Sequence, residues 1–446
     1  MRRFTAAIAA LLWPLTIAAQ VVPKIPVETY RLDNGLRVIL SADHSTQVVT
    51  VNLWFNAGSR NEVRGHTGFA HLFEHMMFQG SANVKKGDHF ALVERAGGLT
   101  NASTAEDRTN YFEMLPSNRL NLGLWLEADR MRSLAVTDSN LANQREAVKE
   151  ERRLRVDNQP YTAVFFEGIY ALQDSTTCFP YAHSVIGSMT DLNAAGTGDV
   201  KAFFDLYYAP NNATLVVAGD FEPAQAKGMI SEAFGSIPRG AEAPAVTCDA
   251  RFSPGRVRKP WPDAKATLPG AFLAYRVPQY SDADYPAVVL LASILGQGES
   301  SRLNKTVVRE KRLAQAAFTF LNPSAPRRGP GVFLAGTIAN QGVSAEALET
   351  AVSAQIDSIA KHGVSAAELD KAKNGYLATK IQQQQISYFL AEAIQEATMF
   401  LGDPNGVNTD PARYLAVTVA DVRRVAARYF VPENSLVLLV TPGGAQ

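Results

Sequence analysis

Residues 199–219 read DVKAFFDLYYAPNNATLVVAG, and residues 421–441 read DVRRVAARYFVPENSLVLLVT. The two stretches align without a gap at an offset of 222 residues, close to half of the 446-residue chain. Five positions are identical, and the first of them pairs Asp199 with Asp421. Each stretch predicts an amphipathic helix, a turn that contains proline, and a strand of β-branched residues and leucine. The repeat therefore predicts two similarly folded halves.

The segment between the two copies has the composition of a linker. Residues 237–265 contain five prolines, together with glycine and alanine. We therefore expect two domains, at residues 22–236 and 250–446, joined by a linker at residues 237–249.

Local patterns in the first half mix strands with helices. Strands are predicted at residues 38–40 and 48–55, and Asp33-Asn34-Gly35 predicts a hairpin turn. Helices are predicted at residues 67–78 and 140–155. Because these elements show no regular βαβ rhythm, the pattern favours an α+β fold.

The composition is that of an ordinary globular protein and excludes several classes. The chain is 46% hydrophobic and 19% charged, and its 43 basic residues equal its 43 acidic residues. A nucleic-acid-binding protein would need a basic excess or stripe, so we expect no nucleic-acid partner. The only cysteines, Cys178 and Cys248, suit no metal-binding spacing. Their sequence leaves open whether they form a disulfide or remain free thiols.

The N-terminus predicts a secretory signal peptide at residues 1–19, MRRFTAAIAALLWPLTIAA. Arg2 and Arg3 precede an apolar stretch, and small residues follow it. The stretch is short for a membrane span and contains Pro14. No later segment is apolar enough to span a bilayer, so we expect an exported protein without a membrane span, most simply in the periplasm.

One short motif carries the chemistry, His71-Leu72-Phe73-Glu74-His75. On a helix, the two histidines lie one turn apart on one face, so both can reach a zinc ion about 2.0–2.1 Å from each nitrogen. Glu74 then lies beside the ion without having to bind it, as a general base for water would. Apolar neighbours argue against a solvated helix, and buried polar groups need partners that a metal supplies. The motif therefore predicts a zinc site.

Two histidines leave a catalytic zinc ion short of protein ligands, because such sites usually have three. The predicted helix at residues 140–155 offers carboxylates at Glu146, Glu150 and Glu151. Glu151 shares the apolar side of Val148, whereas Glu150 lies nearer the flank. The spacing favours Glu151 and leaves Glu150 open.

The motif and its surroundings resemble the pitrilysin family of inverted zinc (HxxEH) metallopeptidases, and in particular bacterial zinc proteases similar to processing peptidases. Glu151 follows His75 at the family's spacing for the distal ligand. The resemblance covers nearly the whole mature chain. Its other parts are NAGSRNE (56–62), GHTGFAHLFEHMMFQG (65–80), NASTAEDRTNYFE (101–113), LGQG (295–298) and SSRL (300–303).

The resemblance implies two homologous α/β-sandwich domains that form one half of a clamshell peptidase. A second subunit would complete a chamber for unfolded peptide. One zinc ion per chain would be bound by His71, His75 and Glu151, with Glu74 as the general base. An edge strand would add the peptide substrate as an extra strand, and an arginine of the second domain would contact it. The implied substrate-binding residues are Asn101, Ala102, Ser103, Thr104 and Arg309.

Two positions depart from the family pattern. Gln144 stands where an assisting carboxylate is often found, and Ala316 stands where a tyrosine follows the arginine by seven residues. The missing tyrosine favours a heterodimer with a related subunit that carries it, and a homodimer stays open. The alternative function is a non-catalytic structural subunit. The intact motif favours an exported zinc endopeptidase.

Overall fold

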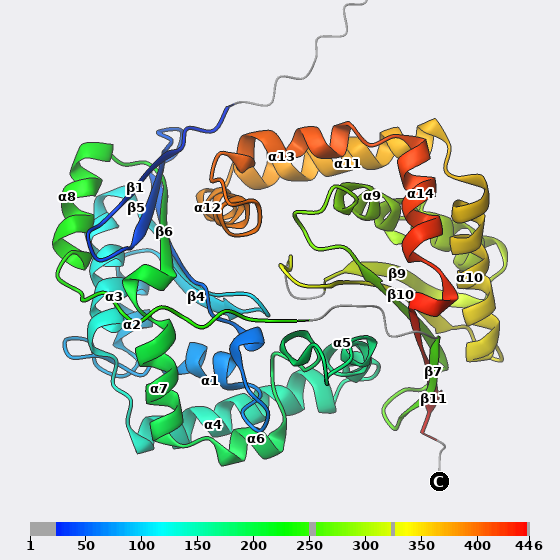
Figure 1. Ribbon diagram of the computed structural model, residues 1–446, viewed down its shortest axis with the longest axis horizontal. Coiled ribbons are helices and arrows are strands. Elements are labelled where there is room, and N and C mark those ends of the chain that lie inside the picture. The colour runs from blue at the N-terminus through cyan, green and yellow to red at the C-terminus, as the bar shows by residue number, and fades with distance from the viewer. Residues whose placement is uncertain (1–23, 249–255, 323–325, 444–446) are drawn as a thin grey trace, which may run out of the picture.

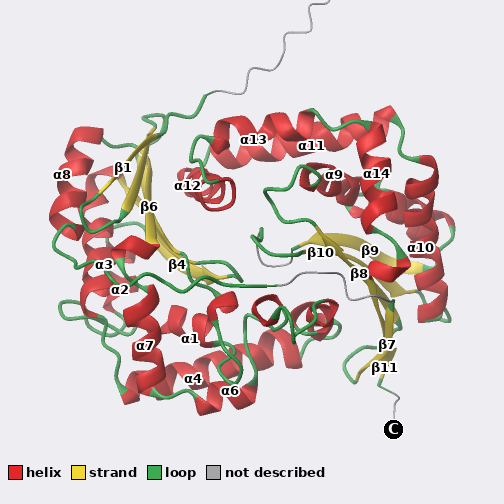
Figure 2. Ribbon diagram, in the orientation of Figure 1, coloured by secondary structure: helices red, strands yellow, loops and turns green. Residues whose placement is uncertain are grey.

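The computed structural model describes residues 24–248, 256–322 and 326–443. The expected signal peptide at residues 1–19 lies outside these residues, as does the start of the expected second domain. The described strands form two sheets, one on each side of the molecule, and helices surround both (Figures 1 and 2). This arrangement confirms the α+β class and the two-part architecture.

The first sheet has six strands in the order β1-β2-β6-β3-β5-β4. The expected hairpin turn joins β1 to β2, and Gly35 within it adopts a φ of +93°, which favours glycine. Strand β4 lies at one edge of the sheet. The strands are β1 (Glu28–Arg31), β2 (Arg37–Ala42), β3 (Val48–Phe55), β4 (Leu99–Thr104), β5 (Thr109–Pro116) and β6 (Ala213–Gly219).

The second sheet has five strands in the order β7-β11-β8-β10-β9, which leaves β9 at one edge. Its central pairs are antiparallel, and β7 joins β11 in parallel, just as β2 joins β6 in the first sheet. The strands are β7 (Val257–Asp263), β8 (Gly270–Val277), β9 (Ala314–Leu321), β10 (Gly331–Ala339) and β11 (Ser435–Pro442).

Fourteen α-helices lie in the described residues, and they complete both halves. The helix expected at 67–78 is α1, and the one expected at 140–155 is α4, which continues into a π-helical turn (Arg153–Asp157). The helices are α1 (Phe69–Met76), α2 (Asp88–Arg95), α3 (Leu120–Ser133), α4 (Asp138–Arg152), α5 (Thr162–Phe166), α6 (Met189–Ala194), α7 (Thr197–Tyr207), α8 (Pro223–Phe234), α9 (Tyr285–Gly296), α10 (Ala345–His362), α11 (Ala366–Gln384), α12 (Ser387–Glu396), α13 (Gly406–Leu415) and α14 (Val419–Tyr429).

The repeated sequence forms the same structure twice. Helix α7 leads into β6, and α14 leads into β11, each through a short 3₁₀ turn that begins at proline. The amide of Asn212 donates to the Tyr207 carbonyl at 2.8 Å, and that of Asn434 donates to the Tyr429 carbonyl at 2.6 Å. The identical residues therefore recur because each copy needs the same turn contacts.

Each half also covers the sheet of the other half. Helix α12, from the second half, packs its buried residues Leu390, Ala391 and Ile394 against β2 and β6, beside which it lies in Figure 1. In the other direction, residues of α5 and the 3₁₀ turn η4 (Gly168–Leu172) pack against β8, β10 and β11. The two halves are therefore joined by apolar cores as well as by the linker. The domain boundaries expected from the sequence stay a prediction.

The partly buried carboxylate of Glu392 orients α12 on the first sheet. One oxygen of Glu392 accepts hydrogen bonds from Asn52 (2.7 Å), Trp54 (3.0 Å) and Asn110 (2.9 Å). These three donors lie on β3 and β5 and are almost fully buried. Because unpaired buried amides are costly, the three bonds fix one position for the helix.

The structure pairs Cys178 with Cys248, the point that the sequence left open. The disulfide ties the segment after α5 to the linker and closes a loop with a sequence separation of 70 residues. Within the described residues, no helix has the length and apolar character needed to cross a membrane.

Replacing both cysteines by serine is expected to lower the free energy of unfolding by about 2–5 kcal/mol, because the loop then gains freedom in the unfolded chain. Urea unfolding monitored by tryptophan fluorescence measures this change. A thiol assay on the denatured, unreduced wild type is the control, and it should find no free thiol. Equal unfolding midpoints for the variant and the wild type would contradict the prediction.

Candidate metal and catalytic centre

Helix α1 carries the predicted motif, and a buried carboxylate fixes where the helix begins. Glu62 accepts hydrogen bonds from the backbone N–H groups of Gly68 (2.9 Å) and Ala70 (2.8 Å). Such N–H groups have no partner within a helix, so an acceptor from outside the helix satisfies them. The helix then buries its apolar side against the first sheet, through Phe69, Leu72, Phe73 and Met76.

A glycine contact holds a second segment against the start of α1. Gly68 has a φ of +88° and Gly187 a φ of +74°, both in the left-handed region. A Cβ atom on Gly187 would lie 2.4 Å from the Cα of Gly68, so no side chain fits there. The loop that contains Val185 and Ile186 is therefore held close to the motif.

The structure brings His71, His75 and Glu151 together. Oε2 of Glu151 lies 3.2 Å from Nε2 of His75 and 3.6 Å from Nε2 of His71. One potential ligand atom from each residue lies within 4.8 Å of the other two. Tetrahedral bonds of about 2.0–2.1 Å place ligand atoms about 3.3 Å apart, so the separations of Glu151 from the two histidines, 3.2 and 3.6 Å, are close to those of a zinc site.

The surroundings of His71 and Glu151 favour the protonation states that bind metals. Burial lowers the pKa of His71 to about 4, which keeps its imidazole neutral. The hydrogen bond from His75 lowers the pKa of Glu151 to about 2, which keeps its carboxylate charged. Burial acts to lower the pKa of His75, but the hydrogen bond to Glu151 and the charges of Glu74 and Glu151 together outweigh it, so the net pKa is raised. A cation between these groups would replace the proton that they share.

Glu74 lies in the same cavity as the trio but is not one of its three ligand residues. The hydroxyl of Thr104 donates to its Oε2 at 2.6 Å. Burial raises the pKa of Glu74, and the bond from Thr104 only partly opposes this shift. A carboxylate with a raised pKa is a better proton acceptor near neutral pH. The arrangement can therefore support general-base chemistry beside a metal.

Helix α4 separates the two glutamates that the sequence left as alternatives. Glu151 points to the histidines, and its other oxygen lies 3.1 Å from Arg155. Glu150 instead pairs with Arg153 in solvent. The side chain of Gln144, at the position of the absent carboxylate, donates to Asn143 at 2.8 Å and acts to raise the pKa of His75. Of these two glutamates of α4, Glu151 is therefore the one in reach of both histidines.

Strand β4, which contains residues 101–104, presents an open edge beside the trio. Its other side pairs with β5, from Leu99 opposite Met114 to Thr104 opposite Thr109. At the hairpin end, the N–H of Ala105 donates to the Arg108 carbonyl at 2.9 Å. Because antiparallel pairs alternate, the backbone N–H and C=O groups of Ala102 and Thr104 face the open edge.

A cavity of about 430 Å³ contains all the predicted site residues of the first half. The sequence did not indicate its other walls, which come from the π-helical turn after α4, from α5 and η4, and from the loop before α6. The apolar run Val164-Phe165-Phe166 marks that segment as partly buried without indicating which cavity it lines. These additional lining residues are Arg155, Phe165, Phe166, Tyr170, Val185 and Ile186.

The structure does not bring Arg309 to this cavity. Arg309 is exposed, and its guanidinium donates to the carbonyl of Glu299 in the second half. Ala316 lies on β9, opposite Ile338 of β10. Neither residue lines the cavity formed by the described residues around the trio.

Comparison with known proteins identifies relatives along nearly the whole chain. The insulinase family (peptidase family M16) matches residues 37–174, and a peptidase M16 inactive domain matches residues 197–376. The zinc protease PqqE of Helicobacter pylori is 32% identical over 425 residues, which cover 93% of each chain.

Solved structures agree with this result. The crystal structure of a protease from Helicobacter pylori has a TM-score of 0.88 at 31% identity, covering 94% of this chain and all of that one. The periplasmic protease PqqL from Escherichia coli shares the fold at 19% identity, with a TM-score of 0.75. That match covers 94% of this chain but 48% of PqqL.

Glu62→Ala is expected to lower the free energy of unfolding by about 1–3 kcal/mol, because two N–H groups of α1 lose their acceptor while buried. Thermal unfolding measures the loss. Glu62→Gln is the matched control, since its amide oxygen still accepts one bond and should retain part of the stability. An unchanged midpoint in Glu62→Ala would rule out this cap as a determinant of α1.

Proposed function

The chain belongs to the insulinase family of peptidases (peptidase family M16), and on that premise we propose that it is a zinc-dependent endopeptidase for peptides or unfolded protein segments. One observation carries the proposal: ligand atoms of His71, His75 and Glu151 lie within 4.8 Å of one another, with Glu74 beside them in the same cavity. The homologue's name, zinc protease, supports the same metal.

The donor set suits zinc in chemistry as well as in spacing. Two imidazoles and one carboxylate are a common protein ligand set of catalytic zinc, and such a site keeps one further position for water or substrate. When bound, the ion supplies a Lewis acid that polarises the scissile carbonyl and makes water more acidic. We propose one zinc ion per chain.

Glu74 would act as the general base. One of its oxygens accepts the Thr104 hydroxyl, which holds the carboxylate in place. The other oxygen can take a proton from the attacking water and then pass it to the leaving amine. The raised pKa of Glu74, caused by burial, suits both transfers.

The open edge of β4 would bind the substrate as an added strand. The N–H and C=O groups of Ala102 and Thr104 can pair with any peptide backbone, since such pairing does not depend on side chains. The side chains of Asn101 and Ser103 lie on the opposite face of the strand. This mode suits unfolded segments of varied sequence.

A second related subunit would complete the enzyme. The chain spans about half of the PqqL chain, so a chain of that length holds roughly two such units. Together with Ala316 at the tyrosine position and Arg309 outside the cavity, this supports a heterodimer over a homodimer. In that assembly, Arg309 would contact the substrate only after the second subunit has closed the chamber.

Export to the periplasm is the remaining part of the proposal. The signal-like residues 1–19 support it, because their charged start and apolar stretch suit secretion. The shared fold with PqqL, a periplasmic protease, agrees with that location.

Glu74→Gln is expected to keep zinc and lower peptide hydrolysis by about 10²–10⁴-fold, because the base is lost while the ligands stay. Glu151→Gln should instead lose zinc after dialysis, and Glu150→Gln is the matched control that should behave as wild type. Metal analysis and a quenched fluorescent peptide measure both properties. Full activity in Glu74→Gln would refute the base, and a wild type that binds zinc without hydrolysing any peptide would favour the structural subunit.

Chelation is expected to abolish hydrolysis and lower the melting temperature, with recovery on adding zinc. Free zinc at about 100-fold its Kd would stabilise the fold by about 2.7 kcal/mol, because it binds only the folded chain. Glu151→Gln is the control, since its melting temperature should not respond to zinc. A wild type whose activity survives chelation and dialysis would contradict a zinc enzyme.

The heterodimer is tested by purifying the mature chain alone and measuring its mass by sedimentation together with its activity. We expect weak or absent hydrolysis that rises when a related subunit with the tyrosine is added. Robust hydrolysis by a homodimer would overturn this part of the proposal.

A further inference from the structure

A fully buried ion pair joins the second half of the chain to the hairpin that ends β4. Arg327, in the segment before β10, pairs with Glu106, and their side chains are 0% and 1% exposed. Glu106 also accepts a hydrogen bond from the hydroxyl of Tyr170 at 2.9 Å. Glu106 lies in the turn between β4 and β5, so this contact ties the turn to a residue 221 positions away in sequence.

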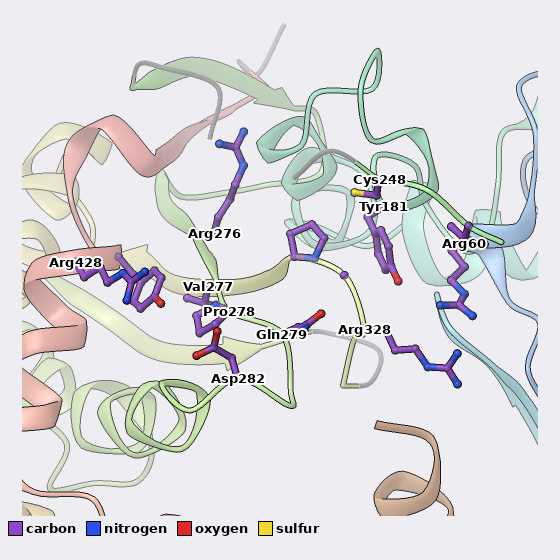
Figure 3. Close-up of a pocket in the computed structure, with 14 residues that line it drawn as sticks. Arg60, Tyr181, Cys248, Arg276, Val277, Pro278, Gln279, Asp282, Arg328 and Arg428 are labelled. Atoms are coloured by element: carbon purple, nitrogen blue, oxygen red, sulfur yellow. The ribbon is translucent and has the colours of Figure 1, made fainter. Parts of the chain in front are cut away.

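The neighbouring carboxylate is held in the same way. Asp107 accepts hydrogen bonds from Arg60 (2.6 Å), the Tyr181 hydroxyl (2.9 Å) and the backbone N–H of Arg328 (3.1 Å). Arg60, Tyr181 and Arg328 lie along one cavity of about 590 Å³ between the halves (Figure 3). The turn between β4 and β5 is therefore held by contacts from both halves of the chain.

Backbone hydrogen bonds also hold this turn in place. The N–H of Ser59 donates to the Ala105 carbonyl at 3.2 Å, and the N–H of Arg60 donates to the Glu106 carbonyl at 3.0 Å. Gly58 allows this approach, since a Cβ atom there would lie 2.2 Å from the Ala105 oxygen. The turn has little freedom to move relative to the first sheet.

The path from this turn to the catalytic base is short. Thr104 ends β4, two residues before Glu106, and its hydroxyl donates to Glu74. Tyr170, which bonds Glu106, also lines the cavity that contains Glu74. A shift of the turn would therefore move the hydroxyl that orients the base.

Burying the Arg327–Glu106 pair costs desolvation free energy, although the two side chains attract each other. Burial acts to lower the pKa of Arg327, but Glu106 outweighs it, so the guanidinium stays charged. Buried ion pairs often give no net stability, whereas loss of one partner leaves an uncompensated charge. We therefore expect the intact pair to fix the position of the turn between β4 and β5 rather than to raise the free energy of unfolding.

We propose that Arg327 is a positioning residue for hydrolysis, which through Glu106 holds the turn at residues 105–108, and hence Thr104 and Glu74, in register for proton transfer. The inference rests on the proposed function of Glu74. Arg327 does not line the described cavity around the trio, so it acts on the reaction without touching substrate. In this way the second half would support catalysis in the first.

The first experiment measures the kinetics of the wild type and its variants, each as the mature chain combined with its partner subunit. Glu106→Gln and Arg327→Gln are expected to lower kcat by about 10–100-fold, with KM within about threefold and zinc content unchanged. Arg327→Lys keeps the charge and should recover part of the loss. Glu349→Gln is the matched control, because Glu349 is a buried carboxylate that Arg256 and Arg258 bind within the second half.

A double-mutant cycle tests the path through Thr104. Thr104→Val removes the bond to Glu74, so Arg327→Lys should lower kcat much less in that background than in the wild type. Additive effects, or a kcat that Arg327→Gln and Glu106→Gln leave unchanged while the control is active, would overturn the inference.

Hydrogen exchange gives a readout that does not need activity. Amide exchange at residues 102–108 should accelerate in Arg327→Lys and stay unchanged in Glu349→Gln. Unchanged exchange in Arg327→Lys would refute the positioning role even if the wild type proved inactive. An inactive wild type with accelerated exchange in Arg327→Lys would refute the proposed function and leave the mechanical link standing.

Discussion

The packing of α4 against α1 is the constraint on which the candidate centre depends. His75 and Glu151 are far apart in sequence, yet their side chains meet at 3.2 Å. Leu141 and Val148 of α4 are buried in the same core as Leu72 of α1. This apolar contact sets the distance between the two helices. It thereby fixes how His71, His75 and Glu151 lie relative to one another. The chemistry is thus positioned by hydrophobic packing that takes no part in it.

Much of the fold could be predicted from the sequence because its signals are periodic or repeated. The repeat at Asp199 and Asp421 predicted two similar halves, and the identical residues make the same caps and turns in both. The motif on α1 was readable because two histidines four apart can face one ion only on a helix. The family resemblance was confirmed by the relatives along the chain.

Other features depend on contacts between distant segments, which carry no local pattern. Glu62 caps α1 from outside the helix, and nothing in its surroundings marks it as a cap. Phe165 and Phe166 reach the cavity from helix α5, which is too short to carry a full period of apolar positions. Arg309 was placed near the substrate by resemblance alone, and in the isolated chain it lies outside the cavity. Arg327 gives no signal, since its partner Glu106 belongs to the other half.

The reciprocal packing of α12 on the first sheet and of α5 with η4 on the second has a consequence for the life of the protein. A nick in the linker would not release two independent pieces, because each piece would keep part of the other's interior. Neither piece would be complete if synthesised alone, because each would lack helices that cover its own sheet.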